Sequence, residues 1–209
     1  MARLIAGIIT YNEEQLLAQC LESIVNKVDE IVLVDGRIAP FPGIGASSTD
    51  NTVAIARDYG AEVITSDTPY PCEADMRSKY LVGEDGDWYL LIDADEKCMT
   101  ALPDISDLPD GVNSYAIHVR MIGAPTNVWR PRLFRHSGTM EYRAIHDALF
   151  SNETLISRPE DATQLHSVWF AHYQMARSEN RRNQKRLYYQ TGYTHEPQYR
   201  KEWRMFNHG

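Results

Sequence analysis

The first hundred residues alternate between short apolar segments rich in β-branched side chains and segments whose apolar residues recur at helical spacing. The apolar segments, expected to be strands, are residues 4–10, 30–35, 62–66 and 88–92. The segments with helical spacing are residues 14–25, 49–59 and 72–82. Strands that alternate with helices in this way are typical of a parallel sheet. The sequence therefore predicts an α/β fold with a mixed, mainly parallel sheet flanked by helices.

The second half of the chain has further strand signals and one helix signal. Strands are expected within residues 114–121, 127–134 (interrupted by Pro131), 148–156 and 164–172, and a helix with a basic face within residues 175–192. Residues 193–209 show little periodicity. We therefore expect one domain at residues 1–174 and a basic helix and tail at residues 175–209. The irregular segment at residues 36–48, rich in proline and glycine, is expected to be a functional loop.

Charge is divided unevenly along the chain. The net charge is −8 over 209 residues, but residues 175–209 hold eight Lys/Arg and three Glu, which gives +5. The first 174 residues therefore hold 13 basic and 26 acidic residues, which gives −13. An acidic body argues against a protein that coats nucleic acid. The basic tail is either a solvated helix face or a surface for peripheral contact with a phosphate, a lipid surface or an acidic partner.

Composition and cysteine content limit the class of protein further. Hydrophobic residues make up 43% and charged residues 24%, which is typical of a globular protein. No apolar run approaches twenty residues and the first residues do not resemble a signal peptide, so no membrane-spanning segment is expected. The three cysteines, Cys20, Cys72 and Cys98, are odd in number and widely spaced. This indicates reduced thiols and a cytoplasmic location.

Acidic side chains follow several of the expected strands. Asp35 ends the second strand, Asp93 and Asp95 follow the fourth, and Tyr11 and Glu13 follow the first. Ligands bind at the carboxyl ends of the strands in an open parallel sheet, so we expect these residues to share one crevice.

A divalent cation is one interpretation of the acidic sequence after the fourth strand. Asp93-Ala94-Asp95-Glu96 offers carboxylate oxygens, which Mg²⁺ and Mn²⁺ prefer, at a strand end where Asp95 is expected to face solvent. His172, where the last strand gives way to the basic helix, could complete the metal shell, with His146 and His166 as alternatives. The other interpretation is a solvated turn with capping carboxylates and structural histidines.

The motifs together resemble the family 2 glycosyltransferases with the GT-A fold. The order and spacing of four segments carry this resemblance: residues 8–14 (Ile-Ile-Thr-Tyr-Asn-Glu-Glu), 29–36 (Asp-Glu-Ile-Val-Leu-Val-Asp-Gly), 48–52 (Ser-Thr-Asp-Asn-Thr) and 88–96 (Trp-Tyr-Leu-Leu-Ile-Asp-Ala-Asp-Glu). Residues 130–135 and 142–147 resemble, more loosely, the Arg-Leu-Phe and His-Glu segments of small family members. The resemblance implies transfer of a sugar from a nucleotide-sugar donor, usually with Mg²⁺ or Mn²⁺, and assigns residues 1–100 to the donor and 101–174 to the acceptor.

The resemblance also implies roles for the residues of the donor half. Asp35 would contact the base or ribose, and Tyr11 and Glu13 would line the same pocket. Arg77 would face the nucleotide, where the family often places an arginine. An insertion at residues 37–47 departs from the family pattern in this region.

The Asp-x-Asp element and the base complete the implied site. Asp95 would be the direct metal ligand, and Asp93 would hold ribose or metal-bound water. An acceptor hydroxyl needs a carboxylate to take its proton. Asp147 is our first choice, although the family usually has glutamate there, and Glu96 and Glu141 are the alternatives. A capping or ion-paired surface carboxylate is an equal interpretation of Asp147.

The predicted reaction is metal-dependent transfer from a UDP-linked sugar with inversion. The acceptor could be a saccharide, a lipid-linked glycan, a protein or a modified nucleobase, and the basic helix could steer an anionic acceptor. One alternative is a nucleotidyltransferase of the same fold, which would need a Gly-rich basic loop near the first strand. The segment at residues 11–14 is acidic instead. The other alternative is a nucleotide-sugar binding module without activity.

Overall fold

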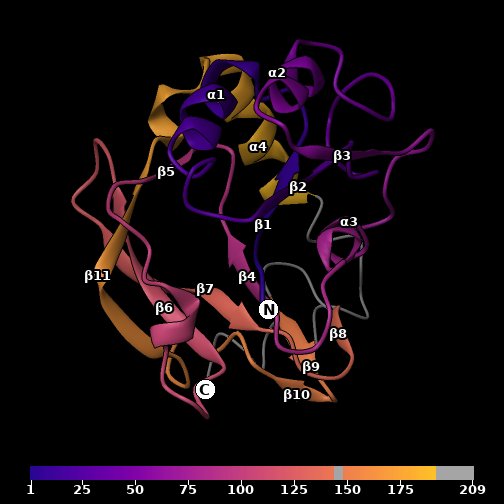
Figure 1. The fold of residues 1–209 in the computed structure, drawn as a ribbon. Coiled ribbons are helices and arrows are strands. Elements are labelled where there is room, and N and C mark those ends of the chain that lie inside the picture. The colour runs from indigo at the N-terminus through magenta and orange to yellow at the C-terminus, as the bar shows by residue number, and fades with distance from the viewer. Residues whose placement is uncertain (144–147, 192–209) are drawn as a thin grey trace.

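The computed structural model describes residues 1–143 and 148–191. Its strands are β1 (Leu4–Thr10), β2 (Glu30–Asp35), β3 (Glu62–Thr65), β4 (Trp88–Leu91), β5 (Glu96–Cys98), β6 (Ser114–Met121), β7 (Asn127–Arg135), β8 (Met140–Tyr142), β9 (Leu149–Ser151), β10 (Thr154–Leu155) and β11 (Thr163–His172). Its helices are α1 (Glu14–Glu22), α2 (Thr52–Asp58), α3 (Glu73–Arg77) and α4 (Glu179–Thr191), with 3₁₀ turns at Ser78–Tyr80, Ile105–Asp107 and Gln174–Ala176. Within these residues, one sheet has the strand order β3-β2-β1-β4-β7-β6-β11-β5 and a smaller one the order β10-β9-β8 (Figure 1).

The first four strands form the parallel sheet that the sequence predicts. β1 pairs in parallel with β2 and β4, and β2 with β3, and all four strands agree with their predicted bounds to within one residue. The second half is mixed, because β7 runs antiparallel to β4 and β6 whereas β11 runs parallel to β6. The segments that follow β1, β2 and β4 therefore meet at one edge of the sheet.

Both faces of β1, β2 and β4 are buried, which explains why these strands are almost entirely apolar, whereas β3 at the end of the strand order is partly exposed. Leu4 and Ile8 of β1 belong to a core shared with α1 and α2, whereas Ile5 belongs to a core shared with α3. Gly7 lies against Tyr80, and a Cβ at Gly7 would come within 2.6 Å of the Tyr80 ring. A larger residue at position 7 would therefore clash with a fully buried aromatic side chain.

β7 is one continuous strand, although the sequence indicates an interruption at Pro131. Proline has no backbone N–H to donate to a neighbouring strand. The pairing of β6 with β7 shifts register between Tyr115 and Ala116, and Ala116 lies opposite Pro131. The proline is therefore accommodated at an irregularity in the ladder.

Several elements are shorter than expected or were not expected. The predicted helix at residues 72–82 is α3 followed by a 3₁₀ turn, and residues 148–156 form two short strands, β9 and β10. β5 and β8 were missed because three residues are too few to show a periodicity. β5 matters most for the site, because it pairs antiparallel with the end of β11 and places Glu96 opposite His172.

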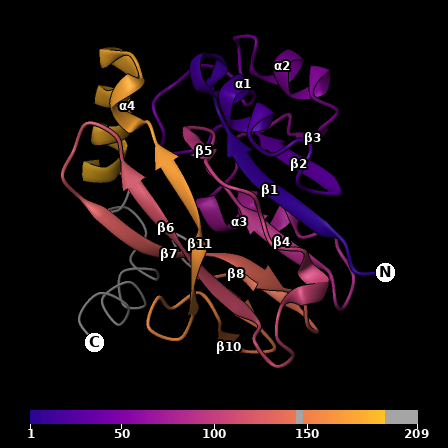
Figure 2. The same cartoon turned by 60° about the vertical axis from the view of Figure 1, so that its left-hand side comes forward.

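The helix predicted at residues 175–192 is shorter in the structure: a 3₁₀ turn ends at Ala176, and α4 begins at Glu179. α4 lies beside the carboxyl ends of β6 and β11 (Figure 2). The boundary predicted at residue 174 stays a prediction, and the tail from residue 192 lies outside the described residues. In the part of the chain that the structure describes, no helix is long and apolar enough to cross a membrane.

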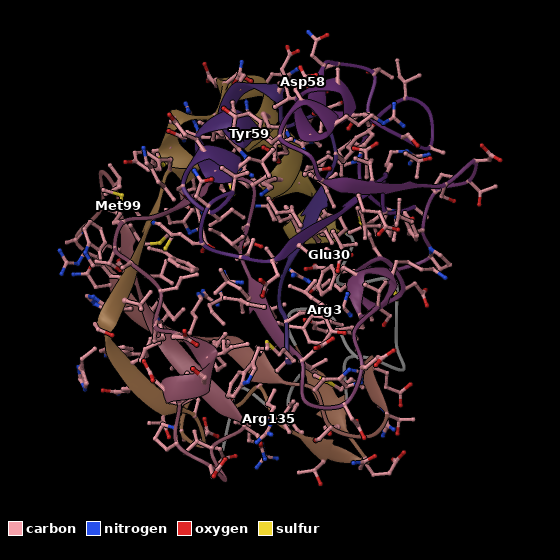
Figure 3. All side chains as sticks on the ribbon, viewed as in Figure 1. Arg3, Glu30, Asp58, Tyr59, Met99 and Arg135 are labelled. Atoms are coloured by element: carbon pink, nitrogen blue, oxygen red, sulfur yellow. The ribbon has the colours of Figure 1, made fainter. Side chains whose placement is uncertain are left out.

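The opposite edge of the sheet, where β1 and β2 begin, is closed by ion pairs. Arg3 contacts Glu30 at 2.9 Å and Asp87 at 2.8 Å, with its side chain 44% exposed (Figure 3). The acidic residues predicted to bind the nucleotide or metal, Glu13, Asp35, Asp93 and Asp95, lie at or just after the carboxyl ends of β1, β2 and β4 instead.

Candidate active site

A cavity of about 400 Å³ opens at the carboxyl ends of β1 and β4. Its walls come from the segments after β1 and β4, the loop at residues 36–41, α3, β7, the end of β11 and α4. Six of the nine predicted site residues line it: Tyr11, Glu13, Arg77, Asp93, Asp95 and His172. Asp35 and Glu96 are described but lie outside the lining, and Asp147 lies outside the described residues. The sequence therefore located the cavity and most of its acidic residues.

Two buried arginines hold Asp93, the first acidic residue after β4. Arg132 Nη2 donates to Asp93 Oδ2 at 2.8 Å, and Arg77 Nη2 lies 3.5 Å from Oδ1. Burial raises the pKa of Asp93, but the charges of Arg132 and Arg77 outweigh it and hold that pKa well below its usual value. Asp93 is therefore a charged carboxylate held by two guanidinium groups.

Asp95 is buried at 1% exposure, so the expectation that it faces solvent is wrong. His172 Nε2 lies 3.0 Å from Asp95 Oδ2, and Arg177 Nη1 contacts the same oxygen. The backbone N–H of Tyr173 also donates to the Asp95 carbonyl at 2.7 Å, which ties the end of β11 to the motif. Burial raises the pKa of Asp95, but the bond from His172 and the nearby cations lower it to about 2.

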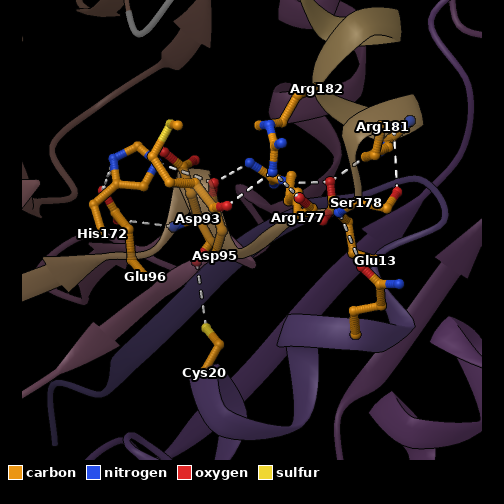
Figure 4. Close-up of polar contacts among 12 residues, drawn as sticks. Glu13, Cys20, Asp93, Asp95, Glu96, His172, Arg177, Ser178, Arg181 and Arg182 are labelled. Atoms are coloured by element: carbon orange, nitrogen blue, oxygen red, sulfur yellow. Dashed lines mark hydrogen bonds and ion pairs between the residues drawn. The ribbon is translucent and has the colours of Figure 1, made fainter. Parts of the chain in front are cut away.

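Arg177 connects Asp95 to Glu13 across the cavity, as Figure 4 shows. Its Nε and Nη2 donate to the two Glu13 carboxylate oxygens at 3.0 and 2.8 Å, a bidentate pair. Arg181 Nη2 adds a contact to Glu13 at 3.1 Å. The side chains of Arg177 and Glu13 are only 5% and 6% exposed. The sequence missed this bridge, and helical spacing could not have revealed it, because Arg177 has an extended backbone conformation before α4 begins at Glu179.

The loop at residues 36–48 builds an aromatic wall of the cavity. The Phe41 ring lies 6.0 Å from the Tyr11 ring and 5.4 Å from that of Tyr188 on α4. The Arg181 guanidinium lies 4.7 Å from the Phe41 ring centroid, within cation–π range. The Tyr11 hydroxyl donates to the Ile44 carbonyl at 2.8 Å, which fixes the loop over β1. The insertion expected to be functional therefore lines the cavity.

Asp35 accepts hydrogen bonds from Ser48 at the end of this loop and does not line the cavity. It is fully buried and accepts hydrogen bonds from the Ser48 N–H at 2.8 Å, the Thr10 hydroxyl at 3.1 Å and the Ser48 hydroxyl. Burial raises its pKa. Both carboxylate oxygens are thus occupied within the protein, and direct contact with a base or ribose stays a prediction.

Glu96 is also fully buried and lies outside the lining of the cavity. Its Oε1 accepts from Arg132 at 2.9 Å and its Oε2 from the Asp93 N–H at 3.0 Å. Burial and the charge of Asp93 outweigh the attraction of Arg132 and raise the pKa of Glu96 to about 7. This placement does not favour contact with an acceptor hydroxyl.

We expect Glu96→Gln to flatten the dependence of stability on pH. Because the pKa of Glu96 is raised from 4.5 to about 7, the folded state binds more protons than the unfolded state between these values. The stability from Glu96 is therefore fully present below pH 4.5 and is lost as pH rises through about 7, amounting to about 3 kcal/mol. Urea unfolding of wild type from pH 5 to 7 should show this decline.

The Glu96→Gln variant should show a clearly smaller slope over the same range, whatever its overall stability. Glu141→Gln is the control, because Glu141 is exposed on β8. Equal slopes in wild type and Glu96→Gln would show that Glu96 is already ionised at pH 5.

None of the alternative site residues that the structure describes lines the cavity. Glu141 pairs with Arg143 at the surface. His166 is exposed on β11 and lies 5.0 Å from the Trp129 ring. His146 lies outside the described residues.

The carboxylates of the cavity do not fit a divalent cation in this arrangement. Both oxygens of Glu13 and of Asp93 contact arginines, and Asp95 Oδ2 is shared by Arg177 and His172. Among residues 1–143 and 148–191, no group of three or more His, Cys, Asp or Glu side chains is arranged to hold a metal ion. Metal ligation by Asp95 and His172 thus stays a prediction, and ligation through Asp95 Oδ2 would require Arg177 to move.

Residues 6–145 match a family model described as "Glycosyl transferase family 2". An uncharacterized glycosyltransferase of Rickettsia felis is 32% identical over 139 residues, which are 64% of this chain and 44% of that protein. A TPR repeat-containing protein of Synechococcus elongatus is 25% identical over 81% of this chain and 40% of its own length. The chain thus spans less than half the length of these curated relatives.

The solved structures that match the chain are more distant in sequence. S. aureus TarS 1–349 in complex with UDP is 19% identical, with a TM-score of 0.46 over 59% of this chain and 37% of that one. Glucosyl-3-phosphoglycerate synthase from Mycobacterium tuberculosis, solved with Mg²⁺ and UDP, is 20% identical, with a TM-score of 0.41 over 59% of this chain and 45% of that one.

Proposed function

Because the chain belongs to the family 2 glycosyltransferases and has their GT-A fold, we propose that it transfers a sugar from a nucleoside-diphosphate sugar to an acceptor hydroxyl. The observation that carries the proposal is the cavity where the first and fourth parallel strands end. It combines an aromatic wall, the Asp93-Ala94-Asp95 motif and a set of buried cations. A UDP-linked sugar is the donor expected from the sequence.

The walls of the cavity suit the two ends of such a donor. Tyr11 and Phe41 offer aromatic surface to a base, because an aromatic side chain can stack on the face of any nucleobase. Arg77, at the side of Asp93, faces the same space from α3. The diphosphate develops negative charge as the bond to the sugar breaks, so cations placed beforehand around it favour the transition state. We propose a single displacement, which inverts the anomeric centre.

Asp147 is the base that we propose for the acceptor hydroxyl, by elimination among the carboxylates considered. Glu96 and Glu141 do not line the cavity, and the described carboxylates that do are paired with arginines. These placements support Asp147 without locating it, because it lies outside the described residues. The acceptor itself, whether saccharide, lipid-linked glycan, protein or modified nucleobase, is left to experiment, as are the cytoplasmic location and peripheral contact of the basic tail.

Turnover of a donor panel tests the proposal. The chain is incubated with UDP-, GDP-, ADP- and CDP-linked sugars, each with Mg²⁺, with Mn²⁺ and with EDTA, and release of nucleoside diphosphate is measured. We expect slow hydrolysis of one donor class, because water replaces an absent acceptor. Tight binding of a nucleotide sugar without turnover in the presence of an extract that supplies acceptors would instead indicate a binding module.

We expect Asp35→Ala to raise KM for the donor more than it lowers kcat. The change leaves the half-buried Ser48 N–H without its acceptor, which costs about 1 kcal/mol, and it loosens the loop that carries Phe41. Steady-state kinetics and urea unfolding measure the two effects. Asp58→Ala, at an exposed acid on α2 (Figure 3), is the matched control and should change neither. An unchanged KM in a correctly folded Asp35→Ala protein would contradict the assigned role.

A further inference from the structure

We infer that cationic side chains of α4 and the segment before it hold the donor diphosphate in this chain, in place of a divalent metal ion. The inference rests on the proposed function and identifies what binds the charged part of the donor. Arginine side chains and His172 already contact the carboxylates that a metal ion would need as ligands.

Arg177 already occupies the position between Glu13 and Asp95. A metal ion at Asp95 Oδ2 would have to displace a guanidinium that is 5% exposed and makes a bidentate pair with Glu13. Breaking a buried ion pair by separating one partner costs several kcal/mol, because an uncompensated charge stays buried. The arrangement therefore favours Arg177 over a metal ion at this carboxylate.

The charge of the cavity lining also favours an anion over a cation. Its carboxylates are Glu13, Glu73, Asp93 and Asp95, and its Lys/Arg residues are Arg77, Arg130, Arg132, Arg177, Arg181 and Lys185. Four negative and six positive groups give +2 before His172 is counted. A divalent ion would raise this to +4 within about 400 Å³. The diphosphate of a nucleotide sugar, with about two negative charges, would balance it instead.

Hydrogen-bond donors on α4 are available to bind such an anion. Arg181 Nε and Nη1 are buried and have no hydrogen-bond partner within the described part of the chain. Its side chain is 11% exposed and lies beside the aromatic wall. Lys185, one helical turn further, lines the same cavity. Unsatisfied buried N–H groups carry a cost that phosphate oxygens would remove.

Calorimetric titration of the full chain tests the inference. The probes are UDP, GDP, ADP and CDP, and inorganic pyrophosphate, which has no base, each in EDTA and with Mg²⁺ or Mn²⁺. We expect pyrophosphate and at least one nucleotide to bind in EDTA, with Kd changed less than about threefold by either metal. Arg181→Ala and Lys185→Ala should each weaken this binding by about tenfold or more, since hydrogen bonds from charged groups to phosphate oxygens are stronger than those between neutral groups.

Arg186→Ala is the matched control, because Arg186 is an exposed cation on the same helix that does not line the cavity. It should leave Kd unchanged. Binding that requires a metal and disappears in EDTA would overturn the inference and leave the proposed function standing. Tighter binding by Arg181→Ala or Lys185→Ala would also overturn it, since α4 would then obstruct the site. If no probe binds under any condition, both the inference and the proposed function fail.

Discussion

Arg177→Met is expected to lower the free energy of unfolding by about 3–5 kcal/mol, the usual result of breaking a buried ion pair by removing one partner. The change leaves the carboxylates of Glu13 and Asp95 buried without the guanidinium that bridges them. Methionine keeps the length of the apolar stem, so packing changes little. Urea unfolding at pH 7 measures the loss, and thermal unfolding should show Tm lowered by roughly 10 °C.

Two controls test whether the loss of stability is specific to this buried bridge or would follow from replacing any ion-paired arginine. Arg143→Ala removes a comparable set of ion pairs at exposed glutamates and should shift Tm far less. Glu13→Gln combined with Arg177→Met removes one of the stranded charges and should recover part of the loss. If Arg177→Met unfolds at the same urea concentration as wild type, the bridge described between Glu13 and Asp95 does not contribute to stability.

Asp147→Asn is expected to reduce kcat by about 10²–10⁴-fold, the usual contribution of a general base. The amide is close to the carboxylate in shape but cannot take the proton of the acceptor hydroxyl. Donor affinity should stay nearly intact, because the proposed donor site is built from other residues. Transfer to the best acceptor, measured with saturating donor, gives kcat, and calorimetry gives the affinity for the nucleotide.

Glu141→Gln and Glu96→Gln complete the comparison for the base. Glu141→Gln should keep normal turnover because Glu141 is exposed and pairs with Arg143 away from the cavity. Near-normal turnover by Asp147→Asn together with a large loss in Glu96→Gln would move the base to Glu96. That result would require the buried Glu96 side chain to become accessible during the reaction.

Much of the fold could be predicted from the sequence, because the parallel strands carry a strong local signal. A strand buried on both faces reads as a continuous apolar run, and β1 and β2 were found with their observed bounds. β5 could not be found in this way. Its three residues form a strand only because β11 supplies a partner some seventy residues away, and no local pattern encodes that pairing.

The positions of the acidic residues of the site could be predicted from the sheet topology, whereas the position of Arg177 could not. The rule that ligands bind where parallel strands end was enough to bring Glu13, Asp93 and Asp95 to one cavity. Spacing also showed a basic helix face, but not that Arg177 would be buried between two carboxylates. That contact spans more than 160 residues from Glu13, and depends on where the β11–β5 pairing directs the chain.

The sequence also overestimated how directly some residues meet a ligand. Asp35 ends a strand at the correct edge, but Ser48 and Thr10 take both of its oxygens. A carboxylate at a strand end is equally useful for closing a loop, and only the positions of its neighbours distinguish the two roles. The insertion at residues 37–47, in contrast, contributes directly to the cavity wall, because Phe41 lines the cavity.

The most direct test of the account is a crystal structure of the full chain with the nucleoside diphosphate that binds best in calorimetry. The account predicts the base against Tyr11 and Phe41 and the diphosphate within hydrogen-bond distance of Arg181 or Lys185. Arg177 should still contact Glu13. A nucleotide bound outside this cavity, or one held at Asp95 through a metal ion with Arg177 displaced, would contradict it.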